Sequence, residues 1–169
     1  MRILAGKFKG AQIQTRSNLN YRPTQSKIRK SLFDTLGDLS GKKVVDLFSG
    51  SGILGFEALS RGARFVTFVE KNKNQIRVLK INCKKNDFND CKILKMDAVE
   101  YLKKGDKTDI ILADPPYGQT ELNLLIDLSL QNLNKDGLFV LETSKRAGFL
   151  NADREKFYGS TRLSFWKKQ

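Results

Sequence analysis

The chain has 169 residues, of which 40% are hydrophobic and 29% are charged, a balance typical of a single folded domain. It contains no histidine, and this excludes Ser-His-Asp and Cys-His catalysis as well as zinc sites that need histidine. Two cysteines without a CxxC pair are too few for a structural zinc site, so we expect no metal. The net charge of +13 favours an anionic partner, with nucleic acid the first choice.

The positive charge is concentrated at the N-terminus. Residues 1–45 carry ten Lys and Arg residues and only two Asp. We expect residues 1–40 to form a basic extension, with a hairpin in residues 2–14 and a helix that starts near Pro23. The N-terminus lacks the apolar core of a secretory signal, and no apolar run is long enough to span a membrane. These features predict a cytoplasmic protein.

The body of the chain, residues 41–169, alternates between strand and helix patterns. Helices are expected after Ser51 and near residues 72–86, 98–104 and 120–133. Short apolar strands are expected at residues 44–48, 64–70, 91–97, 109–114 and 137–143, and a hairpin at 156–166. This order predicts an α/β fold with a mostly parallel seven-stranded sheet, covered on both faces and ending in an antiparallel hairpin.

Acidic residues stand at or near the ends of four successive predicted strands, namely Asp46, Glu70, Asp97 and Asp114. Ligands of open α/β sheets bind beyond the carboxyl ends of the strands, so these acids should converge on one crevice. The first strand is followed by GSGILG (50–55), a GxGxxG turn that lets the backbone approach a ligand closely. Glu70, twenty residues after Gly50, is then placed to accept hydrogen bonds from a ribose.

The most specific motif is Asp114-Pro115-Pro116-Tyr117, which follows the fourth predicted strand. Two consecutive prolines remove two backbone donors and stiffen the turn. The Asp114 carboxylate and a nearby carbonyl, that of Pro115, would then form a corner that only accepts hydrogen bonds. Tyr117 adds an aromatic face on which a flat ring can stack. This combination indicates a site for the exocyclic amino group of a nucleobase.

Four segments occur in the order RILAGKFKG, RPTQSKIRKSLFDTL, DLFSGSGILGFEALSRGA and DPPY, and together they span almost the whole chain. On these segments the chain resembles the bacterial small-subunit (16S) rRNA guanine-N2 methyltransferase family. The resemblance implies a Rossmann-like class I methyltransferase fold with S-adenosylmethionine as cofactor. It also implies methylation of the N2 amine of a specific guanine in 16S ribosomal RNA, within the small subunit or an assembly intermediate.

The same resemblance implies roles for individual residues. The target base would be held by Asp114, Pro115, Pro116 and Tyr117. Gly50 and Gly52 would line the methionine part of the cofactor, and Asp46 would lie near its ammonium group. Glu70 would hold the ribose, and Asp97 would meet the adenine amine. The full cofactor set is Asp46, Phe48, Gly50, Gly52, Glu70, Lys71, Asp97 and Ala98. RNA would be contacted by Lys7, Lys9, Arg22, Pro23 and Thr24.

Other functions fit part of the pattern. An adenine-N6 methyltransferase acting on RNA or DNA would use the same acceptor corner. A nicotinamide oxidoreductase would explain GxGxxG, but it leaves DPPY and the basic N-terminus unexplained. A non-catalytic RNA-binding factor of ribosome assembly would explain the charge, but it does not need acids at the strand ends.

Overall fold

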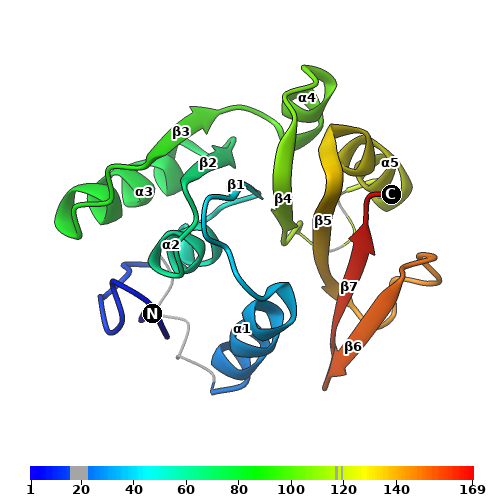
Figure 1. Cartoon of the computed structure of the whole chain (residues 1–169), viewed down its shortest axis with the longest axis horizontal. Helices are drawn as coiled ribbons and strands as arrows, with labels where there is room; N and C mark the ends of the chain where they lie inside the picture. Colours follow the sequence, from blue (N-terminus) through cyan, green and yellow to red (C-terminus); the bar gives the residue numbers. More distant parts are fainter. Residues whose placement is uncertain (16–22, 117, 119) are drawn as a thin grey trace.

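The computed structural model describes residues 1–15, 23–116, 118 and 120–169. In these residues, seven strands form one sheet in the order β3-β2-β1-β4-β5-β7-β6, with five helices packed on its two faces (Figure 1). The helices are α1 (Pro23–Leu36), α2 (Ile53–Ser60), α3 (Lys73–Lys85), α4 (Ala98–Lys103) and α5 (Leu122–Asn132). The strands are β1 (Lys43–Leu47), β2 (Phe65–Glu70), β3 (Cys91–Lys95), β4 (Thr108–Ala113), β5 (Leu133–Ser144), β6 (Arg154–Tyr158) and β7 (Thr161–Lys167).

The strand directions confirm the predicted α/β sheet. Strands β1 to β5 are mutually parallel, whereas β7 is antiparallel to both β5 and β6. The strand order reverses between β1 and β4, which is where a doubly wound sheet opens a crevice for its ligand. The predicted C-terminal hairpin is present, as the β6–β7 pair at the edge of the sheet.

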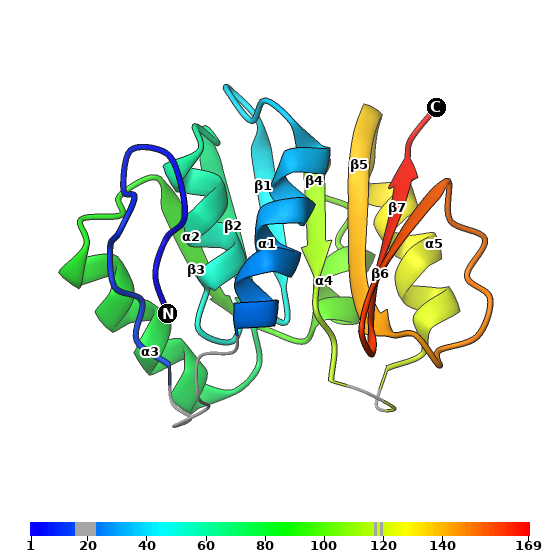
Figure 2. The same cartoon turned by 90° about the horizontal axis from the view of Figure 1, so that it is seen from below.

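Two apolar cores lie on the two faces of the sheet. One contains side chains of α1, α2 and α3, and the other contains side chains of α4 and α5. Figure 2 shows these two groups of helices on opposite faces of the sheet. Strand side chains alternate between them, as Val44 and Val45 do on β1. Because both faces are buried, the central strands are continuous apolar runs, and this explains why they were recognisable in the sequence.

The N-terminal extension belongs to the first of these cores. An antiparallel bridge joins Arg2 to Gln12, as expected for a hairpin. Ile3 and Ile13 are buried beside Ile28 of α1 and Phe56 of α2. The extension therefore packs on the sheet's own helices and shares their core.

The start of β5 differs from the sequence prediction. Helix α5 ends at Asn132, and the next residue, Leu133, already pairs with Thr108 of β4. Pairing then shifts before it resumes at Leu138, where the chain passes Asp136 at a φ of 61°. The apolar spacing predicts Leu133 at the end of the helix, but Leu133 is paired in the sheet and its side chain is buried in the core that α4 and α5 share.

Candidate functional site

A cavity of about 460 Å³ opens at the carboxyl ends of the parallel strands. Its walls come from the carboxyl-terminal parts of β2 and β5 and from the segments that follow β1, β2, β3 and β4, which are far apart in the sequence. It is lined by Phe48, Gly50, Val69, Glu70, Lys71, Asn72, Gln75, Met96, Asp97, Ala98, Asp114, Pro115, Pro116 and Glu142. Nine of these are residues that the sequence assigned to the cofactor or the target base.

The turn after β1 is shaped to bring backbone close to the cavity. Phe48, Gly50 and Gly52 all have positive φ angles, of 56°, 53° and 81°. The Gly50 N–H donates to Glu70 Oε2 at 2.9 Å, and the Asn72 N–H donates to Glu70 Oε1 at 2.7 Å. These two bonds fix the Glu70 carboxylate at the cavity wall and leave it lone pairs for the hydroxyl groups of a ligand.

Two of the predicted cofactor residues lie behind the wall. Asp46 is buried and accepts the Gly55 N–H at 3.0 Å, so it holds the start of α2 in place. Burial raises the pKa of Asp46 well above its ordinary value, the negative charges of Asp114 and Glu70 add to this, and the Gly55 bond opposes it. At Gly52, a Cβ atom would come within 2.5 Å of the Leu79 side chain, so this glycine allows α2 and α3 to pack closely.

The far wall of the cavity is formed where β3 runs into α4. Asp97 caps α4 by accepting the Val99 N–H at 2.9 Å, and Lys71 Nζ lies 3.6 Å from the other carboxylate oxygen. Gln75 of α3 also lines the cavity, and its buried Oε1 has no hydrogen-bond partner among the described residues. Each of these groups can accept or donate to a polar ligand, as the adenosine of a cofactor requires.

Asp114 and Glu142 form the acceptor-rich side of the cavity. Leu47 of β1 pairs with Ala113, and Ala113 pairs with Leu141, so Asp114 and Glu142 lie level on neighbouring strands. Both residues also line a smaller cavity of about 100 Å³ beneath α1. Two carboxyl groups at one level of the sheet therefore lie beneath α1.

The ionisation of this pair is perturbed. Asp114 is exposed as a residue at the cavity mouth, but protein crowded around its carboxyl group displaces water and raises its pKa to about 6. Burial, and then the nearby charge of Asp114, raises the pKa of Glu142 to about 8. The sequence prediction covers the acids at the ends of the first four strands and does not include Glu142, which lies near the end of the fifth, in LFVLET.

Several predicted substrate residues lie outside the described structure. Tyr117 and Arg22 are among the residues that the structure does not describe. The backbones of Pro23 and Thr24 begin α1, but their side chains are not described either. The roles proposed for these four residues therefore stay predictions.

Lys7 and Lys9 are exposed, but they lie away from the cavity. The Lys7 N–H donates to the carbonyl of Ser60 at 2.7 Å. Ser60 is the last residue of α2, a helix that runs from the carboxyl edge of the sheet back to the amino edge. The structure therefore places the tip of the N-terminal hairpin at the edge opposite the site.

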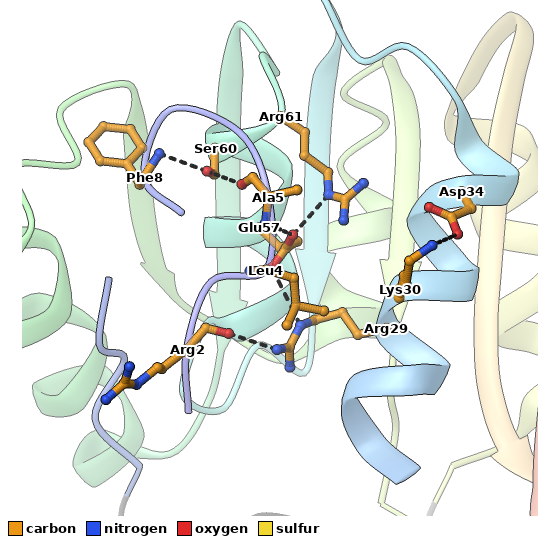
Figure 3. A network of polar contacts seen from close by, with 10 residues as sticks. All are labelled: Arg2, Leu4, Ala5, Phe8, Arg29, Lys30, Asp34, Glu57, Ser60 and Arg61. Carbon is orange, nitrogen blue, oxygen red and sulfur yellow. Dashed lines mark hydrogen bonds and ion pairs between the residues drawn. The ribbon is translucent and has the colours of Figure 1, made fainter. Parts of the chain in front are cut away.

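A buried carboxylate docks this hairpin on α2. Glu57 is 0% exposed and accepts the N–H groups of Leu4, at 2.8 Å, and Ala5, at 3.1 Å (Figure 3). The Arg61 Nε atom lies 2.9 Å from the same carboxylate and the Arg29 Nε atom 3.5 Å from it. The sequence contained a signal for this role, because Glu57 is the only charged residue in the apolar helix ILGFEALS.

The cavity as a whole suits a ligand that carries hydrogen-bond donors. Four carboxylates line it, those of Glu70, Asp97, Asp114 and Glu142, so it can hold hydroxyl, amino and ammonium groups. Within the described residues there is no group of three or more Cys, Asp or Glu side chains that could hold a metal ion. In the same part of the chain, no helix has the length and apolarity needed to cross a membrane.

Comparison with known proteins shows which family the chain resembles. The family model described as "Conserved hypothetical protein 95" matches residues 1–167. A protein named "Ribosomal RNA small subunit methyltransferase D" from Buchnera aphidicola is 34% identical over 88% of this chain and 80% of its own length. The protein of the same name from Escherichia coli K12 is 27% identical over 100% and 90%.

Solved structures share the same architecture. A hypothetical protein of Thermus thermophilus superposes with a TM-score of 0.83 at 27% identity, over 98% of each chain. A SAM-dependent methyltransferase from Agrobacterium tumefaciens shares the fold with a TM-score of 0.68, at 23% identity over 88% of this chain and 63% of its own. The family model matches nearly the whole chain, and the fold is shared with methyltransferases. Proteins named as small-subunit rRNA methyltransferases are among the relatives of the chain. The chain belongs to the conserved hypothetical protein 95 family.

Proposed function

We propose that the protein methylates the exocyclic N2 amine of a specific guanine in small-subunit (16S) ribosomal RNA, with S-adenosylmethionine as the methyl donor. The observation that carries this proposal is the single cavity that joins Glu70 and Asp97 to the Asp114-Pro115-Pro116 corner. The relatives named small-subunit rRNA methyltransferases support RNA as the substrate class. The cytoplasm, where ribosomes are assembled, would be its place of action.

The residues around the cavity fit the proposed cofactor. Glu70 is held by two backbone N–H groups and keeps acceptors for a ribose diol. Asp97 and Ala98 would meet the adenine ring, and Gly50 lets the backbone approach the methionine part. Gln75 offers a buried Oε1 without a partner in the described chain, which an amino group of the cofactor would satisfy. When bound, S-adenosylmethionine supplies a methyl group activated by its sulfonium.

The Asp-Pro-Pro corner would hold and orient the amine. The Asp114 carboxylate and the Pro115 carbonyl would accept its two N–H groups, which turns the nitrogen lone pair toward the methyl group. Such positioning contributes up to about 7–11 kcal/mol to a barrier reduction. Asp114, whose pKa burial raises to about 6, would also take the proton that the amine loses.

The RNA would approach the carboxyl edge of the sheet with the target base out of its stack. Extrusion of a base costs a few kcal/mol in a duplex and less in a loop. Stacking on Tyr117 would recover about 1–3 kcal/mol of this. Lys7 and Lys9 would contact phosphates far from the target base, since they lie at the other edge of the sheet.

A methyl-transfer assay tests the proposal directly. The protein is incubated with labelled S-adenosylmethionine and small-subunit particles, or 16S rRNA, lacking the modification. Digestion to nucleosides and mass spectrometry should then show N2-methylguanosine. N6-methyladenosine would instead support the adenine-N6 alternative, and the absence of any transfer would support a non-catalytic assembly factor.

A further inference from the structure

A basic and aromatic surface lies on the side of the cavity away from the N-terminal hairpin. We call it the β5–β6 rim and define it by Lys145, Arg146, Phe149 and Phe157. Lys145 and Arg146 are both exposed. The exposed fraction is 88% for Phe149 and 58% for Phe157. Among the described residues the only other large hydrophobic side chain exposed to this degree is Ile81 of α3. The proposed function gives this rim no role.

The rim lies at the same edge of the sheet as the catalytic corner. Strand β5 runs parallel to β4, so Lys145 follows β5 at the edge where Asp114 follows β4. Glu142, three residues before Lys145, lines the cavity itself. The Lys145 N–H donates to the carbonyl of Ser160 at 2.9 Å, which places the β6–β7 turn beside the end of β5 (Figure 2).

Phe149 is held outward by an anchored loop. On one side of it, Arg162 Nη1 donates to the carbonyl of Gly148 at 2.6 Å. On the other side, the side chain of Leu150 is buried, and Trp166 Nε1 donates to the carbonyl of Asn151 at 3.1 Å. An exposed ring between two fixed points costs little conformational entropy when it binds a partner.

Phe157 joins this surface through Arg162. In the sheet, Phe157 and Thr143 both pair with Arg162, so all three side chains share one face. Arg162 also reaches the carbonyl of Gly148, and it therefore connects the strand that carries Phe157 to the loop that carries Phe149. The two rings come from different segments but are organised around one buried arginine.

The chemistry of the rim matches unpaired RNA. Every base offers a flat face that stacks on an aromatic ring, and neighbouring cations bind the phosphates on either side of it. The loop at 145–153 has two cations and a single acid, Asp153, at its far end. We propose that the β5–β6 rim is a second RNA-binding surface, on which Phe149 stacks an unpaired base of the substrate while Lys145 and Arg146 bind flanking phosphates. This inference rests on the proposed function and extends it to the far side of the cavity.

Binding measurements on the full chain test the rim separately from catalysis. Phe149→Ala should weaken binding to a 16S rRNA transcript about 5- to 150-fold, the range expected when about 1–3 kcal/mol of base stacking is lost. Phe149→Trp should bind like the wild type, whereas Phe149→Leu, which keeps an apolar side chain but no ring, should bind like the alanine variant. Affinity for S-adenosylhomocysteine should not change in any of them.

A charge variant tests the phosphate contacts. The slope of log affinity against log salt concentration is negative, and the double variant Lys145→Ala/Arg146→Ala should make it less steep by about 1.5. The matched controls are Ile81→Ala, for an exposed apolar side chain, and Lys103→Ala/Lys104→Ala, for two exposed cations at the end of α4, on the face of the sheet opposite the N-terminal hairpin. Both controls should leave RNA binding nearly unchanged.

The outcomes separate this inference from the function on which it rests. If the wild type transfers no methyl group to small-subunit particles, the proposed function is wrong. If it transfers methyl groups but Phe149→Ala binds the transcript as tightly as wild type, the rim is not an RNA surface. A loss that appears only on assembled particles would also overturn the inference, since it would indicate contact with a ribosomal protein.

Discussion

The buried Glu57 carboxylate is expected to stabilise the whole N-terminal extension. It accepts two backbone N–H groups, from Leu4 and Ala5, and it pairs with Arg61 and Arg29 (Figure 3). A hydrogen bond to a charged group contributes about 1.5–3 kcal/mol, and removal of one partner from a buried ion pair costs about 3–5 kcal/mol. Because these contributions share one carboxylate they do not add, and we expect Glu57→Ala to lower the free energy of unfolding by about 3–5 kcal/mol.

Urea denaturation measures this change, and amide hydrogen exchange at Leu4 and Ala5 locates it. Glu57→Gln keeps one acceptor oxygen but loses the charge, so its loss of stability should be smaller than that of Glu57→Ala. The control is Asp34→Ala, which breaks the exposed Lys30–Asp34 ion pair on α1 and should leave the denaturation midpoint unchanged. A loss below about 1 kcal/mol for Glu57→Ala, with normal protection at Leu4 and Ala5, would refute the reasoning.

Three further predictions concern the site and its surroundings. Asp114→Ala should abolish methyl transfer but leave most affinity for S-adenosylhomocysteine, measured by calorimetry, and near-normal turnover would exclude the acceptor role. Burial raises the folded-state pKa of Glu142 from 4.5 to about 8. Between these two pH values the unfolded chain is ionised at this residue and the folded chain is not, so the free energy of unfolding should fall as the pH rises. Glu142→Gln should therefore unfold at a higher urea concentration than wild type at pH 8.5 and at about the same concentration at pH 4.5; an equal difference at both pH values would contradict this. The Sγ atoms of Cys83 and Cys91 lie 3.5 Å apart, so diamide should oxidise the two thiols to one intramolecular disulfide, seen as the loss of both free thiols and prevented by Cys83→Ser.

Local patterns in the sequence determined the elements of the fold. Apolar runs such as VVDLF and DIILAD are strands because both of their faces are buried, and the turn residues that bound them are local as well. The acids at the strand ends were recognisable for the same reason, since parallel strands must present their carboxyl ends at one edge. Glu70, Asp97 and Asp114 do line one cavity.

Tertiary structure alone decided which of these residues face the cavity. Asp46 lies beneath the glycine turn, where its carboxylate accepts the Gly55 N–H. At Gly52, the side chain of Leu79 from α3 occupies the space that a Cβ atom would need. Glu142 reaches the cavity because β5 pairs with β4 in a register that puts it level with Asp114. Strand register over such separations depends on long-range packing, which local periodicity does not contain.

The net charge of +13 was determined by composition, but its distribution in space was not. The basic N-terminus suggested one RNA-binding surface, yet Glu57 docks the hairpin so that Lys7 lies at the edge opposite the cavity. The cations nearest the end of β5, Lys145 and Arg146, come from the C-terminal part of the chain. Sequence thus sets which charges are present, whereas hydrogen bonds between distant segments set which of them stand beside the site.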